Sequence, residues 1–159
     1  MHPDATLARL LATFPRAGRV EWIGVRPARH VTPQALPEVL ATDGGLVGDH
    51  YGGGKREVTL IQAEHLVAVA SLVGRPRIDP ALVRRNILVA GINLVALKGR
   101  RFRVGAVLLE HTGACEPCSR MEVALGPGGY NAMRSHGGIT ARVLERGTIR
   151  LGDAVSPVA

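Results

Sequence analysis

The chain has 159 residues, and its 46% apolar content is enough to enclose a core, so we expect one globular domain over residues 1–159 with a core from about 18 to 155. It holds no apolar run of about 18 residues and no basic, then apolar, leader, which predicts a cytoplasmic protein that does not cross a membrane. Its two cysteines, three residues apart, argue against a secreted disulfide framework and predict reduced thiols.

The net charge of +7 comes mostly from arginine and predicts an anionic partner. Aromatic residues make up only 3% of the chain, and the arginines are scattered, which argues against a nucleic-acid surface because such sites combine charge with stacking rings. A phosphate-bearing small molecule fits better, since arginine binds phosphate through two parallel hydrogen bonds. The alternative for most of these arginines is an ordinary solvated surface.

In chain order, the first half predicts a short amphipathic helix near residues 4–13 and a half-buried strand over 18–27. Residues 30–56 are rich in proline and glycine and predict a loop region with at most a short edge strand. A buried strand over 57–61 and a helix over 62–74, ended by Gly74, should follow.

The second half predicts a helical turn and a strand within 79–91, then two short strands within 100–114 that are separated at Gly105. A helix is expected within 116–125, with Pro117 near its first turn, and two strands within 136–158, with turns at Gly147 and Gly152–Asp153. Many short strands with few helices between them favour a mostly β (α+β) fold, a barrel or closed mixed sheet, over a doubly wound fold.

Both cysteines lie in the stretch "ACEPC", and three kinds of site remain open for them. A structural zinc site needs four ligands, and the sequence offers no second cysteine pair and no matching histidine spacing. A dithiol redox pair is compatible with a position just before a predicted helix. In thioredoxin-like folds, however, the pair follows an early strand, whereas here it comes late in the chain. The third is a single reactive thiol, Cys118, with Arg120 nearby, while Cys115 suits a small buried apolar residue.

Two further segments carry candidate ligand-binding residues. The stretch "GLVGDHYGGGKREVTLI" places Asp49, His50, Lys55 and Arg56 beside glycines that allow close approach to an oxyanion, but it lacks the spacing of a Walker A loop. In "VRRNILV", Arg85 and Asn86 stand at the mouth of a strand, where one could face a ligand. The alternatives are a plain surface loop, a surface arginine and a turn asparagine.

The order of these motifs resembles the MOSC domain, the family related to the C-terminal region of molybdenum cofactor sulfurases. The similarity rests on "GLVGDHYGGGKREVTLI", then "RRNILVAGINLVALKGRRFRVGAVLLEHTGACEPCSRME", then "HGGITARVLERGTIRLGDAV", and it extends from about Gly18 to Val155. The resemblance implies a MOSC-type β-barrel with a few peripheral helices. The chain lacks the aminotransferase-like domain of larger relatives, so no pyridoxal phosphate is expected.

The resemblance also implies a function and a set of site residues. Cys118 would be the essential cysteine, acting as a ligand to molybdenum or as a sulfur carrier, with molybdenum cofactor (molybdopterin) as the bound group. Arg85, Asn86 and Arg120 would hold its phosphate or pterin, and the same cleft would be lined by Asp49, His50, Lys55 and Arg56. We expect an enzyme of sulfur transfer or of molybdenum-dependent reduction of N-hydroxylated compounds, served by a redox or sulfur-donor protein. A dithiol oxidoreductase using Cys115 and Cys118, or a non-enzymatic anion-binding module, stays open.

Overall fold

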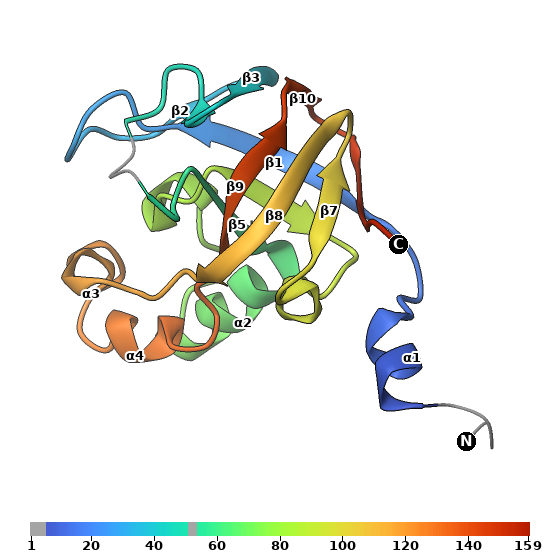
Figure 1. Cartoon of the computed structure of the whole chain (residues 1–159). Helices are drawn as coiled ribbons and strands as arrows, with labels where there is room; N and C mark the ends of the chain where they lie inside the picture. Colours follow the sequence, from blue (N-terminus) through green and yellow to red (C-terminus); the bar gives the residue numbers. More distant parts are fainter. Residues whose placement is uncertain (1–5, 51–53) are drawn as a thin grey trace.

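The computed structural model describes residues 6–50 and 54–159, and its centre is a closed β-barrel (Figure 1). Seven strands of the described residues form it: β1 (Gly18–Val25), β5 (Val58–Gln62), β6 (Ile87–Ala90), β7 (Arg101–Val104), β8 (Val107–Ala114), β9 (Ile139–Glu145) and β11 (Ala154–Pro157). They pair in the order β11, β7, β8, β9, β5, β6, β1, and the pairing of β1 with β11 closes the ring. The predicted mostly β, barrel-type fold is confirmed.

Neighbouring barrel strands run antiparallel except β5 and β6, which run parallel. A parallel pair needs a crossover connection, and α2 (Ala63–Val73) supplies it, followed by the short helical turn η1 (Pro80–Val83). The helix α2 ends at Gly74, whose φ of 76° is left-handed, as the sequence predicts. This crossover brings the start of β6 beside β5 and β1, close to the functional site described below.

Residues 30–56 contain more regular structure than expected. They hold β2 (Gln34–Ala35), which pairs with β1, and β3 (Glu38–Thr42) and β4 (Gly45–Leu46), which form a small second sheet with β10 (Gly147–Arg150). Val39 and Ala41 of β3 are buried while their neighbours face outward. The prediction of a loop with at most one edge strand is therefore wrong, because this period-two alternation continues between Pro37 and Gly44.

The remaining helices lie outside the barrel (Figure 1). They are α1 (Leu7–Ala12), the turn η2 (Leu94–Leu97), α3 (Ser119–Leu125) and α4 (Gly129–Met133). The helices α2, α3 and α4 gather at one end of the barrel, while α1 lies apart near the N-terminus (Figure 1). None of the residues of α1 is buried. Residues 4 and 5 of the predicted first helix lie outside the described residues. Nothing in the sequence analysis anticipated α4, and the C-terminal stretch forms three strands instead of two.

The core has two parts that match this layout. One fills the barrel interior with side chains such as Ile23, Leu60 and Phe102. The other lies between the barrel and the gathered helices and includes Leu66, Met121 and Met133. Among the described residues, no helix has the length and apolar character needed to cross a membrane.

Candidate functional site

Cys118 lies between the end of β8 and the start of α3, in a segment of residues 115–118 that we call the cysteine loop. It is the residue immediately before α3, in extended conformation, and its thiol makes no hydrogen bond to the helix. The sequence predicts a helix within 116–125, which would include Cys118, whereas α3 begins one residue after it, at Ser119. The side chain is exposed, so its thiol is accessible to a ligand or reactant.

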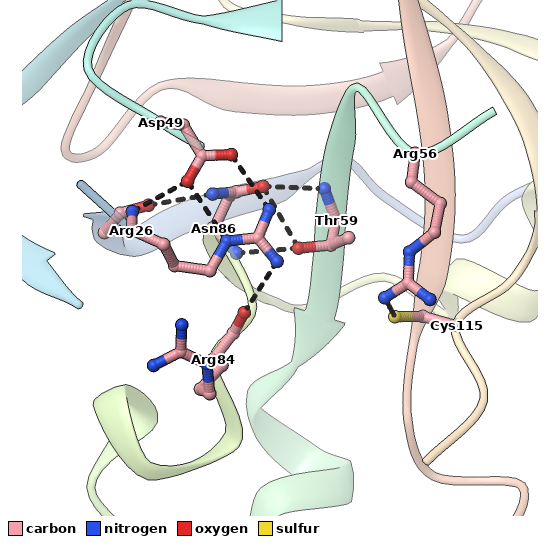
Figure 2. A network of polar contacts seen from close by, with 8 residues as sticks. Arg26, Asp49, Arg56, Thr59, Arg84, Asn86 and Cys115 are labelled. Atoms are coloured by element: carbon pink, nitrogen blue, oxygen red, sulfur yellow. Dashed lines mark hydrogen bonds and ion pairs between the residues drawn. The ribbon is translucent and has the colours of Figure 1, made fainter. Parts of the chain in front are cut away.

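Cys115 occupies a different environment. It is only 1% exposed, which agrees with its interpretation as a small buried residue. Its backbone N–H donates to the Gly138 carbonyl, and its sulfur accepts from Arg56 Nη2 at 3.5 Å (Figure 2). The guanidinium of Arg56 therefore supplies positive charge beside the buried thiol, while Cys118 faces solvent.

Arg85 fixes the position of the cysteine loop. This side chain is 5% exposed, and its guanidinium donates to the carbonyls of Val83, Cys115, Glu116 and Gly137. Burial lowers the pKa of Arg85 below its ordinary value. Since most of its N–H groups are used by carbonyls, Arg85 acts mainly as a positioning residue for the loop.

Asp49 and Arg26 form a second fixed element. Arg26, which follows β1, donates to both carboxylate oxygens of Asp49 at 2.8 and 3.0 Å, and its backbone N–H donates to the same carboxylate (Figure 2). The Asp49 side chain is 1% exposed. Asp49 thus holds the loop after β4 against β1, and the next residue, His50, reaches the pocket described below.

Asn86 is placed behind the site instead of on its surface. Its side chain is completely buried; Oδ1 accepts from the Thr59 N–H and hydroxyl, and Nδ2 donates to the Gly24 carbonyl (Figure 2). All of these partners belong to β1 and β5. That Asn86 holds a cofactor stays a prediction; in this structure its amide joins the strands that carry the site.

These elements surround a pocket of about 240 Å³ that we call the arginine pocket. Its lining residues are Arg26, Arg29, His50, Arg56, Arg84, Arg85, Cys118, Arg120 and Met121. Of the predicted residues, it brings together His50, Arg56, Arg85, Cys118 and Arg120. Lys55 is exposed outside this lining, and residues 51–53 of the predicted glycine loop lie outside the described part of the chain.

Sequence reasoning missed three of the arginines that line the pocket. Arg26 and Arg29 follow β1, and Arg84 caps η1 in a left-handed conformation with a φ of 59°. The barrel closes these distant segments onto the cysteine loop, which no local pattern reveals. The available signal was the position of Arg26 and Arg84 at strand and turn ends, where functional side chains often lie.

The arginine pocket has a strongly positive potential. Among the described residues, Arg26 alone of its six arginines forms an ion pair with a carboxylate. Burial, and then the charges of Arg120 and Arg26, lower the pKa of Arg84, and Arg120 lowers the pKa of the neighbouring His30. Nearby positive charges lower the pKa of a basic group in this way, and a bound anion would oppose the effect.

The described residues hold no group of three or more histidine, cysteine, aspartate or glutamate side chains able to bind a metal ion. A structural zinc site needs four such ligands. A metal at Cys118 would therefore have to bring most of its own ligands.

Replacing Arg120 with glutamine is expected to raise the pKa of His30 toward 6.5, because the charge of Arg120 is the largest cause of its depression. Because folding lowers this pKa, the unfolded chain binds the His30 proton more readily, and the free energy of unfolding falls below about pH 6.5. The substitution should make this fall smaller. An NMR titration of the histidine ring protons measures the shift. Arg9→Gln, on the distant helix α1, is the control, and an unchanged His30 pKa in Arg120→Gln would contradict the charge assignment.

Comparison with known proteins identifies the family. A family model described as the MOSC domain matches residues 47–156. The structure of the YUAD protein from Bacillus subtilis aligns with a TM-score of 0.78 and 20% identity, covering 90% of this chain and 97% of that one. YiiM from Escherichia coli aligns with a TM-score of 0.72 and 20% identity, covering 91% and 71%.

YiiM from Geobacillus stearothermophilus is similar to the chain at a TM-score of 0.73 and 18% identity, with 89% and 75% covered. No curated protein sequence matches the chain. At these identities the solved structures support the fold alone. The family model, in contrast, covers well over half of the sequence and includes both cysteines and most of the arginine pocket. The chain belongs to the MOSC domain family.

Proposed function

We propose that the arginine pocket binds molybdenum cofactor, with Cys118 as the metal ligand or sulfur carrier, for sulfur transfer or for reduction of N-hydroxylated compounds. The observation that carries this proposal is an exposed thiol in a pocket lined by six arginines. A thiolate is a soft ligand suited to a transition metal, and arginine is the side chain best suited to a phosphate.

The donor set of this chain fits that group. The described residues offer one exposed thiol and no metal-binding cluster, so they suit a metal that is already chelated by its own organic ligand. They also offer arginines whose charges are not balanced by carboxylates, which suits an organic ligand with an anionic end. When bound, molybdenum cofactor supplies a redox-active metal centre to which sulfur or oxygen can be transferred.

The protein side chains have separable roles in this proposal. After burial, the charge of Arg120 is the largest cause that lowers the pKa of Arg84, and these two arginines would hold the anionic end of the ligand. Arg85 would keep the cysteine loop in place through its bonds to the Cys115 and Glu116 carbonyls. Cys118 would then present its sulfur at the pocket rim, in contact with solvent.

The size of the arginine pocket agrees with binding of one end of a larger ligand. Its volume of about 240 Å³ is below the roughly 300–1,000 Å³ typical of complete small-molecule sites. An anionic end would fill the pocket, and the remainder would extend past the exposed Cys118 toward solvent. A redox or sulfur-donor protein, which we expect in the cytoplasm, would approach from this side.

Dithiol chemistry is the second candidate, and a specific contact favours it. Arg56 Nη2 lies 3.5 Å from the Cys115 sulfur, where its charge would stabilise a thiolate. Cys118, being exposed, would attack a disulfide substrate, and Cys115 would resolve the mixed disulfide. This candidate needs both thiols, whereas cofactor binding needs Cys118 alone.

The proposal is tested by expressing the protein in a host that makes molybdenum cofactor and measuring bound molybdenum and pterin. We expect near-stoichiometric molybdenum in the wild type and in Cys115→Ala, and a loss of tenfold or more in Cys118→Ser, because serine replaces a soft ligand with a hard, protonated one. Equal molybdenum content in Cys118→Ser and the wild type would overturn the assignment of Cys118 as the metal ligand.

Two other outcomes distinguish the alternatives. Metal-free protein that reduces insulin disulfides only when both cysteines are present would support the dithiol oxidoreductase. Binding of polyanions with a steep salt dependence and without any effect of either cysteine would support a non-enzymatic anion-binding module, because such binding depends on charge neutralisation.

A further inference from the structure

A second cavity, of about 420 Å³, lies on another side of the cysteine loop, and we call it the rear cavity. It is lined by Val95, Lys98, His111, Gly113, Ala114, Cys115, Glu116, Ser135, Gly137, Gly138 and Ile139. It shares no lining residue with the arginine pocket. The two are connected through Arg85, which lines the arginine pocket and donates to carbonyls of Cys115, Glu116 and Gly137 in the wall of the rear cavity.

The wall of the rear cavity is built of backbone packed too tightly for side chains. A Cβ added at Gly137 would lie 2.1 Å from the Cys115 carbonyl oxygen, and one at Gly138 would lie 1.9 Å from the Leu60 carbonyl oxygen. Gly138 also has a φ of 89°, which glycine adopts without strain. Ser135, in the same wall, has a φ of 67°. A positive φ is uncommon for residues other than glycine, and such conformations are found more often at ligand sites.

His111 supplies a neutral hydrogen-bond donor to the rear cavity. Its Nδ1 accepts the Gly99 N–H at 3.2 Å, which assigns the proton of the neutral ring to Nε2. Burial, and then the charge of Lys98, lower the pKa of His111, so the ring is neutral at physiological pH. The lining of the cavity therefore combines a neutral imidazole with a lysine and a serine side chain.

We propose that the rear cavity is a second small-molecule site, which binds a compact organic carboxylate. Lys98 and His111 hold the carboxylate, and Val95 and Ile139 contact the apolar body. Ligand sites differ from packing defects in combining an apolar lining with a few polar groups whose charge is complementary to that of the ligand. Glu116 is the one acidic residue of the lining, so its charge weakens carboxylate binding without preventing it.

The test is an NMR titration of the isotope-labelled full chain with sodium benzoate, using benzamide as the uncharged probe of the same shape. We expect saturable benzoate shifts at the amides of Gly113, Gly138 and Ile139, with weaker shifts from benzamide. Lys98→Gln and His111→Leu should each weaken benzoate binding by about tenfold, since each removes a hydrogen bond to a charged group. Glu116→Gln should strengthen it several-fold by removing a like charge.

Arg120→Gln is the control, because it alters the arginine pocket and leaves the rear cavity intact. Benzoate shifts confined to amides near Arg120 and Cys118, equal shifts from benzamide, or shifts that never saturate would each overturn the inference. Lys98 is exposed and its substitution is not expected to unfold the chain, so the test holds even if His111→Leu folds poorly. None of these readouts depends on molybdenum, so the inference and the proposed function fail separately.

Discussion

Replacing Arg85 with methionine is expected to lower the free energy of unfolding by about 2–4 kcal/mol, because it leaves several buried carbonyl oxygens without their donor. Methionine has a similar length and fills the space, so the loss reflects hydrogen bonds to Val83, Cys115 and Gly137 instead of a cavity. The cost of burying the guanidinium works in the opposite direction, which is why the net loss is smaller than the sum of the separate bonds.

Urea unfolding measures this loss, and two variants make it specific. Arg85→Lys should recover little stability, since one ammonium cannot reach carbonyls that the planar guanidinium reaches together. Arg84→Gln is the matched control: Arg84 is the neighbouring arginine and makes one side-chain bond, to the Val31 carbonyl, so we expect a loss below about 1 kcal/mol. Similar losses for both arginines would contradict the positioning role of Arg85.

From the sequence, Arg85 is predicted to bind a ligand, and these bonds give it a structural role that the sequence does not predict. An arginine at the mouth of a strand can face a ligand or turn inward, and local spacing does not distinguish the two directions. The choice is made by the carbonyls of the cysteine loop and of Gly137, about 30 and 50 residues further along the chain. Long-range hydrogen bonding of this kind has no local sequence pattern.

The barrel, in contrast, could be predicted because each strand carries its own pattern. In β7 the exposed Arg101 alternates with the buried Phe102 and Val104, and the turn at Gly105 follows directly. Every residue of β5 and β6 is buried, so neither strand alternates between exposed and buried residues; β6 is an apolar run that ends before Gly91, and β5 leads directly into α2. The local pattern of apolar residues therefore predicts the strands. The order in which they pair, including the closure of β11 on β1, is set by tertiary contacts.

Helix α4 shows a different limit of local reasoning. Its sequence contains Gly129, and glycine disfavours helices, so the stretch gives no helical signal. Tertiary contacts stabilise this helix: Glu122 of α3 accepts the N–H groups of Gly128 and Tyr130, both at 3.0 Å, and Ala132 and Met133 are buried in the second part of the core. These bonds hold the pKa of Glu122 below its ordinary value, which shows that they favour the carboxylate form.

Within the site, the sequence could identify a side chain when its reactivity makes it a candidate whichever way the side chain points. Cys118 is one, because a thiol before a helix is a candidate wherever the loop turns. The arginine pocket could not be predicted as a whole, since Arg29 and Arg84 reach it from the segments that follow β1 and η1. The charge excess of the chain indicated an anionic partner, and closure of the barrel determined which arginines meet.

Asn86→Ala is expected to lower the free energy of unfolding by about 3 kcal/mol, because it removes one acceptor and one donor from a fully buried network. The Thr59 N–H and hydroxyl lose the oxygen that they share, and the Gly24 carbonyl loses its side-chain donor. Water cannot replace these groups without entering the space between β1, β5 and β6. Stability should therefore fall even in the absence of any ligand.

Asn93→Ala is the matched control, since Asn93 is exposed before η2 and its side chain makes no capping bond, so a change within about 0.5 kcal/mol is expected. Urea unfolding of metal-free protein gives both values. Molybdenum per folded molecule should be unchanged in Asn86→Ala, because its amide contacts strands and not the arginine pocket. Unchanged stability together with a loss of bound molybdenum would mean that Asn86 contacts the ligand directly, as its place in the sequence first indicated.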